Sequence, residues 1–492
     1  MKLCVTSKQM KVIEADAIER IGIPSLVLME RAAMAVVAAV VEIGNKSDRI
    51  WVLCGSGNNG ADGIATARML FEKGYLVTIV CVGDLSKATQ EFMVQKYIVE
   101  ALKVPCIELK DFMPIKEDLI VDALLGIGLS RAVSGKYKDC IEVVKDAKCQ
   151  KVIAVDIASG LSADTGEVLG CAMHASTTVT FGYALAGLYL GSGIVYSGNI
   201  VVADIGFPKQ CEGVVLEPMF MLEESDLCKI PERSEVANKG TYGRLLVIAG
   251  SEGMSGAAYL CAMSAYRMGA GLVKILTTES NRQVLQMQLP EAIVQTYKEE
   301  NLGESVREAC AWATSIVMGP GLSTKTYVKE LVETVLSSTG HNVPIVLDSD
   351  ALNTISEREE LTSYYRNKII ITPHVKEMSR LTDLSVAQIK KDPIGVARAY
   401  SKKHGITCVL KDATSVIANG FGDLILNRSG NSALAKGGTG DVLAGMIGGL
   451  TCLSLSTMEC ASLGAFMHGR AGVKASDVLG KHGVMASDLL LE

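Results

Sequence analysis

Short apolar runs that end at glycine or aspartate alternate with helical stretches along this chain, and the alternation occurs in two successive series. In the first series, residues 7–21 and 24–43 have helical periodicity, and the apolar runs lie at 50–54, 76–82, 119–122 and 152–156. The second series has apolar runs at 244–249 and 272–276, a helical stretch at 256–268 and a helix near Asp441. Strands that alternate with helices form parallel sheets covered on both faces. The sequence therefore predicts an α/β protein with two such sheets.

The segment 217–238 separates the two series. It loses the alternating pattern and gathers acidic residues together with Pro218 and Pro231. A chain of 492 residues exceeds what one hydrophobic core usually organises. We therefore predict two domains, residues 1–222 and residues 223–492.

Composition restricts the possible partners and location. The net charge of -6, with no block of Lys and Arg, argues against nucleic acid or an anionic membrane as a partner and favours a small molecule. The 14 cysteines are scattered and none has C-x-x-C spacing, as is typical of buried thiols in a reducing compartment. The early charges at the N-terminus leave no room for a secretory signal, so we expect a cytoplasmic protein. The uncharged segment 168–203 has the β-branched runs of buried strands and not the composition of a membrane span.

The first candidate site is a glycine loop between an apolar run and an Ala-rich helix. Gly55, Gly57 and Gly60 fit G-x-G-x-x-G, and Asp84 ends the next strand at the distance expected of a ribose-binding acid. Such a loop lets the backbone and a helix N-terminus approach a phosphate, although a turn without a ligand has the same pattern. Asp122 and Asp156 also end apolar runs, which predicts two carboxylates at the ligand edge of one sheet. Each aspartate alone is equally typical of a helix cap or a turn.

Several motifs in order give the first half a family resemblance. The loop GSGNNGADG is followed by VDALLGIGLSR, VDIASGLSADTG, TVTFGYALAG and GNIVVADIGFP. Over most of residues 1–210 this series resembles the N-terminal epimerase domain of the bifunctional NAD(P)H-hydrate repair enzymes, which implies a Rossmann-like three-layer α/β/α fold. Ala61 and Ala158 stand where the family often has glycine and proline, and these small changes are not expected to remove the site.

The resemblance implies a substrate site, a catalytic residue and a cation site. The hydrated dinucleotide would contact Asn58, Asn59, Gly60, Ala61 and Asp62, and also Gly126, Ile127, Gly128, Leu129, Ser130, Arg131 and Ala132. Asp156 would lie at the reacting ring as the acid/base group, because inversion requires a titratable group near the hydrated carbon. Asn59, Asp122 and Ser159 would bind K+, and hard oxygen ligands suit such a cation.

The second candidate site is the stretch SGNSALAKGGTGDVLAGMIGGL. Gly437, Gly438, Thr439 and Gly440 form a loop that opens a helix, and Asp441 lies in its first turn. Backbone N–H groups in such a loop can surround an anion, which suits transfer of a phosphoryl group to a hydroxyl that the aspartate orients or deprotonates. The alternative is a glycine-rich helix start that packs against a neighbour, with the aspartate as its cap. The uncharged run 442–458 predicts a buried helix.

The second half resembles the C-terminal dehydratase of the same repair enzymes, within the ribokinase-like small-molecule kinases. The motifs are KGTYGRLLVIAGSEGMSGA, MGPGLS, VLDSDALN, ITPHVKEMSRL, LKDAT and GGTGD, and the likeness covers nearly all of residues 225–492. It implies a ribokinase-like α/β domain with Asp441 as the catalytic residue, and Mg2+ on the phosphates. Substrate contacts are implied at Gly321, His374, Val375, Lys376, Glu377, Met378, Ser379, Arg380 and Asp441. ADP contacts are implied at Lys411, Asp412, Ala413, Thr414 and Ser415, and at Asn431, Ser432, Ala433, Leu434, Ala435, Lys436, Gly437, Gly438, Thr439 and Gly440.

In the second half, the departures from the family pattern are concentrated in two places. Val375 and Lys376 replace proline and glycine, and Lys436 precedes the anion loop. Either lysine could contact a phosphate, although a solvated lysine is the more common case. We expect His374 to be a hydrogen-bond donor to the substrate and not a catalytic base.

The predicted function is repair of hydrated NADH and NADPH. The first domain would interconvert the R and S hydrates, and the second would use ADP to dehydrate the S hydrate, giving NAD(P)H, AMP and phosphate. The alternative is an ATP-dependent kinase of a small vitamin-like alcohol with a non-catalytic Rossmann-like binding domain. We also expect a homo-oligomer.

Overall fold

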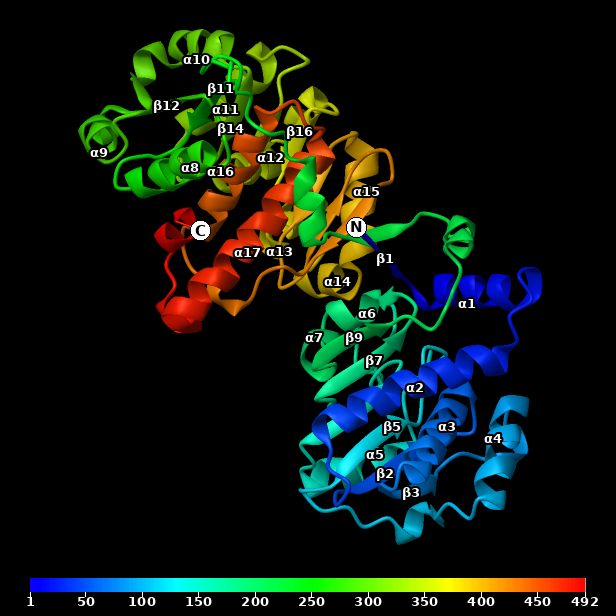
Figure 1. Cartoon of the computed structure of the whole chain (residues 1–492). Helices are drawn as coiled ribbons and strands as arrows, with labels where there is room; N and C mark the ends of the chain where they lie inside the picture. Colours follow the sequence, from blue (N-terminus) through cyan, green and yellow to red (C-terminus); the bar gives the residue numbers. More distant parts are fainter. Residues whose placement is uncertain (492) are drawn as a thin grey trace. The chain divides into compact units, whose positions relative to one another are not determined.

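The computed structural model describes residues 1–491 and consists of two compact units (Figure 1). The N-terminal unit is Lys2–Pro218, and the C-terminal unit begins at Met219 and includes Met1. The predicted boundary after residue 222 assigns the strand Met219–Met221 (β10) to the first domain. In the structure β10 pairs in parallel with β19 (Leu424–Asn427), so this strand belongs to the C-terminal unit.

The main sheet of the N-terminal unit has the strand order β4-β3-β2-β5-β6-β7-β9, and all of these pairs are parallel. The direction of the strand order reverses between β2 and β5. The strands β3 and β4 follow β2 on one side of it, and the chain then crosses over so that β5 pairs with β2 on the opposite side. Ligands bind at such a reversal, outside the carboxyl ends of the strands. The strands are β2 Arg49–Cys54, β3 Leu76–Cys81, β4 Cys106–Glu108, β5 Leu119–Ala123, β6 Lys151–Val155, β7 Thr177–Phe181 and β9 Asn199–Ala203, and β1 (Lys2–Val5) pairs separately with β8 (Ala184–Leu185).

Successive side chains of β2 point alternately into two different cores, one on each face of the sheet. Ile50, Val52 and Cys54 belong to the core that includes residues of α2 and α3, whereas Trp51 and Leu53 belong to the core on the α5 side. The strand is buried on both faces, which explains its continuous apolar run. The helices are α1 Ser7–Ala15, α2 Ser25–Ile43, α3 Asn58–Glu72, α4 Gln90–Ala101, α5 Lys136–Ala147, α6 Ala186–Tyr189 and α7 Gly193–Tyr196.

The sheet of the C-terminal unit is parallel from β13 to β17 and continues through antiparallel pairs to β19. Its order is β13-β12-β11-β14-β15-β16-β17-β18-β19-β10, so a second reversal lies between β11 and β14. The remaining strands are β11 Arg244–Ile248, β12 Leu272–Thr278, β13 Ile293–Tyr297, β14 Ser315–Met318, β15 Ile345–Leu347, β16 Ile369–Ile371, β17 Thr407–Leu410 and β18 Ser415–Ala418.

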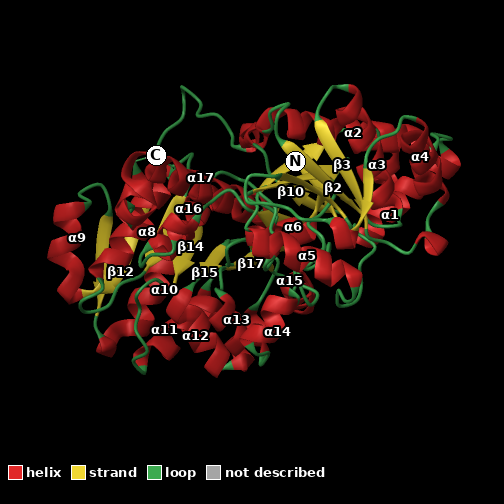
Figure 2. Cartoon of the chain, turned by 90° about the horizontal axis from the view of Figure 1, so that it is seen from below, coloured by secondary structure: helices red, strands yellow, loops and turns green. Residues whose placement is uncertain are grey.

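Helices flank the strands within each unit (Figure 2). Those of the C-terminal unit are α8 Ser255–Arg267, α9 Arg282–Gln288, α10 Leu302–Trp312, α11 Tyr327–Ser338, α12 Ser349–Glu357, α13 Val375–Thr382, α14 Val386–Lys391, α15 Pro393–His404, α16 Thr439–Thr451 and α17 Thr457–Gly483. The helix predicted over 442–458 is present only in part, as α16, whose residues from Val442 to Thr451 are buried. The chain leaves the helix after Thr451, and α17 begins at Thr457. Among residues 1–491, no helix has both the length and the apolarity needed to cross a membrane.

Glycines allow α16 to pack closely against α8. A Cβ atom at Gly445 would lie 2.1 Å from the carbonyl oxygen of Cys261, and one at Gly449 would lie 2.6 Å from that of Ala265. On the sheet side, a Cβ at Gly448 would lie 2.2 Å from a methyl carbon of Val317. The glycines of this helix are therefore needed for packing, in addition to any role of its N-terminus in ligand binding.

We expect Gly445→Ala to lower the stability of the C-terminal unit by about 1 to 3 kcal/mol, because the added methyl group meets backbone that cannot move aside easily. Gly256→Ala in α8 is the matched control, since nothing lies within 4 Å of the added Cβ. That change should be neutral or stabilising by up to about 1 kcal/mol. Thermal unfolding of both variants tests the prediction, and equal stabilities would contradict it.

Candidate active sites

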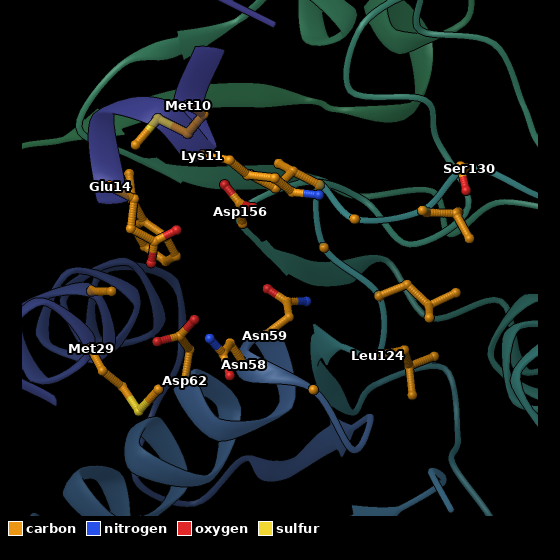
Figure 3. A pocket seen from close by; sticks show the side chains of 18 of the residues that line it. Met10, Lys11, Glu14, Met29, Asn58, Asn59, Asp62, Leu124, Ser130 and Asp156 are labelled. Atoms are coloured by element: carbon orange, nitrogen blue, oxygen red, sulfur yellow. The ribbon is translucent and has the colours of Figure 1, made fainter. Parts of the chain in front are cut away.

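The N-terminal unit has a cavity of about 710 Å³ at its reversal point (Figure 3). Its walls come from the start of α3 after β2, the segment after β5, the end of β6, and helices α1 and α2. The volume is in the range of small-molecule sites. Of the predicted substrate residues, Asn58, Asn59, Asp62, the whole segment 126–132 and Asp156 line this cavity, whereas Gly60 and Ala61 are buried and do not line it.

Close packing of the backbone requires glycine at two positions of the loop, whether or not a ligand binds there. A Cβ atom at Gly60 would lie 1.9 Å from the carbonyl oxygen of Gly55, and one at Gly55 would lie 2.0 Å from that of Leu124. Gly57 has open space around it and is the N-cap of α3. Asp84, which the spacing suggests as a ribose-binding acid, is exposed, accepts a hydrogen bond from the Ser86 N–H and does not line the cavity.

Asp156 has an unusual backbone conformation at the end of β6. Its φ of 68° lies in the left-handed region, and its N–H donates to the Val179 carbonyl at 2.7 Å. The side chain points into the cavity (Figure 3), and the Thr180 hydroxyl donates to its Oδ1 at 3.3 Å. Burial raises the pKa of Asp156 to about 6, although hydrogen bonds from the Ile127 N–H and Thr180 oppose the shift. A carboxyl group with this pKa can give or take a proton near neutral pH.

The three predicted K+ ligands contact consecutive residues of one segment. Asp122 Oδ1 accepts the Leu124 N–H at 3.4 Å, Ser159 Oγ accepts the Leu125 N–H at 2.9 Å, and a Cβ at Gly126 would lie 3.2 Å from Asn59. Ser159 also donates to Asp122 through its hydroxyl at 2.6 Å and its N–H at 2.8 Å.

The side chain of Asn59 has unmet hydrogen-bonding capacity. Within residues 1–491, neither its buried Oδ1 nor its buried Nδ2 has a hydrogen-bond partner. Burial raises the pKa of the neighbouring Asp122 carboxyl to about 6. Carboxylate, hydroxyl and amide oxygens together suit an alkali cation, so the residues present fit the predicted ion.

Sequence reasoning missed the part of the cavity that comes from α1 and α2. Lys11 and Glu14 of α1 line the cavity together with the apolar residues Met10, Leu28, Met29, Phe181, Ile205 and Phe207. These residues are not part of a recognisable motif. The helical periodicity of residues 7–21 predicts which face is buried, but not that its neighbour is a cavity.

In the C-terminal unit, α16 begins at the predicted anion loop. Gly438 has a φ of 88° and is the N-cap. The Thr439 hydroxyl donates to the carbonyl oxygens of Leu434 and Lys436 at 2.9 Å, which holds the loop. Buried His468 lies with Nε2 2.9 Å from the Thr439 carbonyl, and burial lowers its pKa to about 4, so the ring is neutral and donates this bond. The N-terminus of a helix has unpaired N–H groups that attract anions.

Asp441 lies beside two aspartates that sequence reasoning did not select, and beside Lys411, which the resemblance assigns to ADP. Burial and the carboxylates of Asp348 and Asp350 raise the pKa of Asp441 to about 7, and Lys411 opposes the shift. Lys411 forms a buried ion pair with Asp348, with Nζ 2.8 Å from Oδ1. Both missed aspartates follow β15, so the signal that identified Asp122 and Asp156, a carboxylate at a strand end, could also have identified them.

Asp350 and Asn353 join two segments that the resemblance assigns to substrate. Asp350 accepts the Ser323 N–H at 2.8 Å, which holds the loop containing Gly321. Asn353 accepts a hydrogen bond from Arg380 at 2.5 Å. The structure therefore connects the Gly321 loop with the segment 374–380 through α12.

His374 is the N-cap of α13, and both of its ring nitrogens face groups of this helix. Its Nδ1 accepts the N–H groups of Lys376 and Glu377 at 3.0 and 3.2 Å, so Nε2 carries the proton. Nε2 lies 3.4 Å from Glu377 Oε1, so a carboxylate of the same helix already competes for its proton. Donation from His374 to the substrate stays a prediction. Met378 and Glu377 are buried, Val375 and Ser379 are partly buried, and Lys376 is exposed. The predicted contact at Met378 thus involves a side chain in the core.

The structure brings together the two predicted nucleotide segments. Residues 411–415 include the turn between β17 and β18, and Arg428 Nη1 donates to the carbonyl oxygens of Ala413 at 3.2 Å and Gly430 at 2.9 Å. Asn431 donates to Ser476, and Lys436 donates to the His482 carbonyl at 2.6 Å. Lys436 therefore has an intramolecular partner. In residues 1–491, no group of three or more His, Cys, Asp or Glu side chains is arranged to hold a metal ion.

The pKa of Asp156 leads to a stability prediction. Because the folded-state pKa of about 6 exceeds the ordinary 3.8, the stability linked to this group is complete below 3.8 and is lost as pH rises through 6. Asp156→Asn removes this loss and tolerates the left-handed backbone, so at pH 8 it should be more stable than wild type by up to about 3 kcal/mol.

The comparison with Asp156→Ala separates charge from backbone strain. Alanine also removes the charge but disfavours the left-handed conformation by about 1 to 2 kcal/mol, so this variant should be less stable than Asp156→Asn. Denaturant unfolding at pH 4 and pH 8 measures both effects. A stability difference between Asp156→Asn and wild type that does not grow with pH would contradict the prediction.

Comparisons with known proteins agree with both halves of the structure. A family model described as NAD(P)H-hydrate dehydratase matches residues 245–492, and one described as YjeF-related protein N-terminus matches residues 25–187. A solved structure of a ribokinase-like superfamily protein from Enterococcus faecalis is 27% identical, has a TM-score of 0.50, and aligns over 56% of this chain and 93% of that chain.

Relatives over nearly the whole length identify the family. A bifunctional NAD(P)H-hydrate repair enzyme of Coxiella burnetii is 33% identical over 99% of this chain and 98% of its own length. One of Escherichia coli is 32% identical over 97% of this chain and 90% of its own length. With both domains matched in the same order, the chain belongs to the bifunctional NAD(P)H-hydrate repair enzymes.

Proposed function

We propose that the N-terminal unit interconverts the R and S epimers of hydrated NADH and NADPH, and that the C-terminal unit dehydrates the S epimer with ADP. One observation carries this proposal: each unit places a carboxyl group of nearly neutral pKa at the ligand edge of its sheet. These groups are Asp156 and Asp441. Proton transfer to and from a ring hydroxyl requires such groups.

In the N-terminal unit, the ring of the hydrate would lie beside Asp156, with the rest of the dinucleotide along the segment 126–132. The apolar side chains of α2 and of residues 205–207 exclude water from the ring, and Asp156 holds or moves the proton of its hydroxyl. Asn59, Asp122 and Ser159 would hold K+. When bound, the ion supplies positive charge next to the buried carboxylate of Asp122 and fixes the segment that follows β5.

In the C-terminal unit, Asp441 would take the proton from the ring hydroxyl as that oxygen attacks the terminal phosphoryl group of ADP. The N–H groups at the start of α16 stabilise the charge on the transferred group, and AMP leaves. The phosphate of the resulting ester is a better leaving group than hydroxide. Its departure, with loss of a proton from the adjacent carbon, restores the ring double bond. Mg2+ would lower the charge of the nucleotide phosphates, and Asp348 and Asp350, whose charges act on Asp441, would be the carboxylates that could hold it.

The choice of ADP follows from membership of this family. The alternative kinase function is not favoured, because the model that matches the C-terminal unit is described as a dehydratase and the relatives carry both domains. A homo-oligomer and a cytoplasmic location stay predictions.

Separated R and S hydrates, mixed with the purified protein and either ADP or ATP, test the proposed reactions. With ADP, both epimers should regain the absorbance of reduced nicotinamide, the R epimer after conversion to S. Asp441→Asn should slow this recovery by about 10² to 10⁴-fold and leave epimerisation intact. Asp156→Asn should slow epimerisation and leave dehydration of the S hydrate intact. Recovery from neither epimer, or accumulation of a stable phosphate ester, would contradict the proposal.

The cation site leads to a second experiment. Epimerisation should slow when K+ is replaced by tetramethylammonium at constant ionic strength, because the larger ion cannot approach the oxygens of Asn59, Asp122 and Ser159. Asp122→Asn should weaken the dependence on K+ concentration, and the exposed Asp84→Asn is the matched control. The proposed ion is refuted if the rate of wild-type epimerisation is independent of K+.

A further inference from the structure

Three carboxyl side chains from three different elements enter the cavity of the N-terminal unit. Glu14 comes from α1, Asp62 from α3 and Asp156 from the end of β6, and Figure 3 shows all three directed toward the same space. Asp62 and Asp156 belong to the motifs of the sequence. Glu14 does not, and the family model of the N-terminal domain begins at residue 25, after α1 has ended.

The helix that carries Glu14 is firmly attached to the unit. A capping box of Thr6 and Gln9 starts α1, and the Ser7 N–H and hydroxyl donate to the two carboxylate oxygens of Asp164 at 2.6 and 3.0 Å. Ile13, next to Glu14, is fully buried. Glu14 therefore has a fixed position in the cavity wall and is not on a loose N-terminal arm.

The charged groups around Glu14 come from four elements. Lys11 lies one turn earlier on α1, Glu91 is on α4, and Asp62 and Asp156 lie across the cavity. Burial and Glu91 raise the pKa of Glu14, and Lys11 opposes the shift. Among residues 1–491, no group donates a hydrogen bond to the Glu14 carboxylate. A half-buried carboxyl without a donor is available to a ligand in the cavity.

Inversion at the hydrated carbon makes two demands on the cavity. The carbon is bonded to the ring nitrogen and to the hydroxyl, so the hydroxyl can leave as water while the nitrogen lone pair forms a carbon–nitrogen double bond. Water must then add from the other face to give the opposite epimer. One group must donate a proton to the departing oxygen, and a second group, on the other side of the ring, must accept a proton from the entering water.

We propose that Glu14 is this second acid/base residue and acts across the ring from Asp156, an inference that rests on the epimerase function proposed above. For one epimer, Asp156 protonates the hydroxyl, the carbon–oxygen bond breaks with its electron pair on oxygen, and water leaves. A new water molecule attacks the planar carbon, the double-bond pair returns to nitrogen, and Glu14 takes the released proton. The opposite epimer uses the two residues in exchanged roles, and no electrons are gained or lost.

Asp62 is the rival for this role and is the less suitable of the two. Burial, followed by the charges of Asp156 and Glu14, raises the pKa of Asp62 well above the ordinary value, which favours its neutral acid form. A protonated carboxyl can donate a hydrogen bond to the substrate but cannot accept a proton. We therefore assign Asp62 to substrate binding.

The test compares Glu14→Gln, Glu14→Asp and the exposed control Glu19→Gln in the full-length protein, with R and S hydrates as substrates. Glu14→Gln should lower kcat for epimerisation by about 10² to 10³-fold with little change in KM, because the amide keeps the shape but cannot transfer protons. Glu14→Asp should recover at least part of the rate. The epimerisation rate of wild type should have a bell-shaped pH profile, and this profile should lose one limb in Glu14→Gln.

Dehydration of the S hydrate with ADP is the internal control, because it depends on the other unit. It should be unchanged in all three variants. Wild type that fails to epimerise would refute the proposed function itself. Wild type that epimerises while Glu14→Gln keeps both its rate and its pH profile would refute the role of Glu14 alone. Equal losses in Glu14→Gln and Glu14→Asp would show that the carboxyl group is not what matters, and would also refute it.

Discussion

The positions of both sites depend on the crevice that forms where the strand order of a parallel sheet reverses. In the N-terminal unit the crevice lies between β2 and β5, and it stays narrow because Gly55 lets the loop after β2 meet the backbone at Leu124, while Gly60 lets the start of α3 pack against Gly55. A side chain at Gly55 would push the loop away from Leu124, and one at Gly60 would push the start of α3 away from Gly55. The contacts of Asn59 and Ser159 with residues 125 and 126 depend on this approach, and so does the direction of α3.

Each crevice contains carboxyl groups that are costly to keep ionised. Burial is the largest influence on the pKa of Asp122, Asp156 and Asp441, and in each case it favours the neutral acid. A fold selected for stability alone would place apolar residues at these strand ends. The same cost makes the groups useful, because a carboxyl that titrates near neutral pH exchanges protons readily in both directions.

Much of this arrangement is predictable from the sequence, for reasons that particular residues make clear. Asp156 comes directly after an apolar run, and Asp441 comes directly after a glycine loop. The local pattern and the geometry of parallel sheets together predict that each lies at the edge of a sheet where ligands bind. Glu14 has no such marker, because its position depends on how α1 packs against a distant part of the chain. The boundary near residue 222 is displaced for a similar reason, since β10 is assigned by its pairing with β19, some 200 residues later in the chain.

The two units act on the same ring hydroxyl, but the charged groups around it differ between the two sites. The N-terminal cavity brings three carboxyl groups together with Lys11 and Arg131 as the cations of its wall, which suits a reaction that needs proton donors and acceptors. Near Asp441 the buried ammonium of Lys411 opposes the repulsion of Asp348 and Asp350. A bound nucleotide adds further negative charge and would raise the pKa of Asp441 beyond its proton-accepting range. The positive charge of Lys411 limits this rise. The loop glycines after residue 436 present N–H groups in place of further side-chain cations.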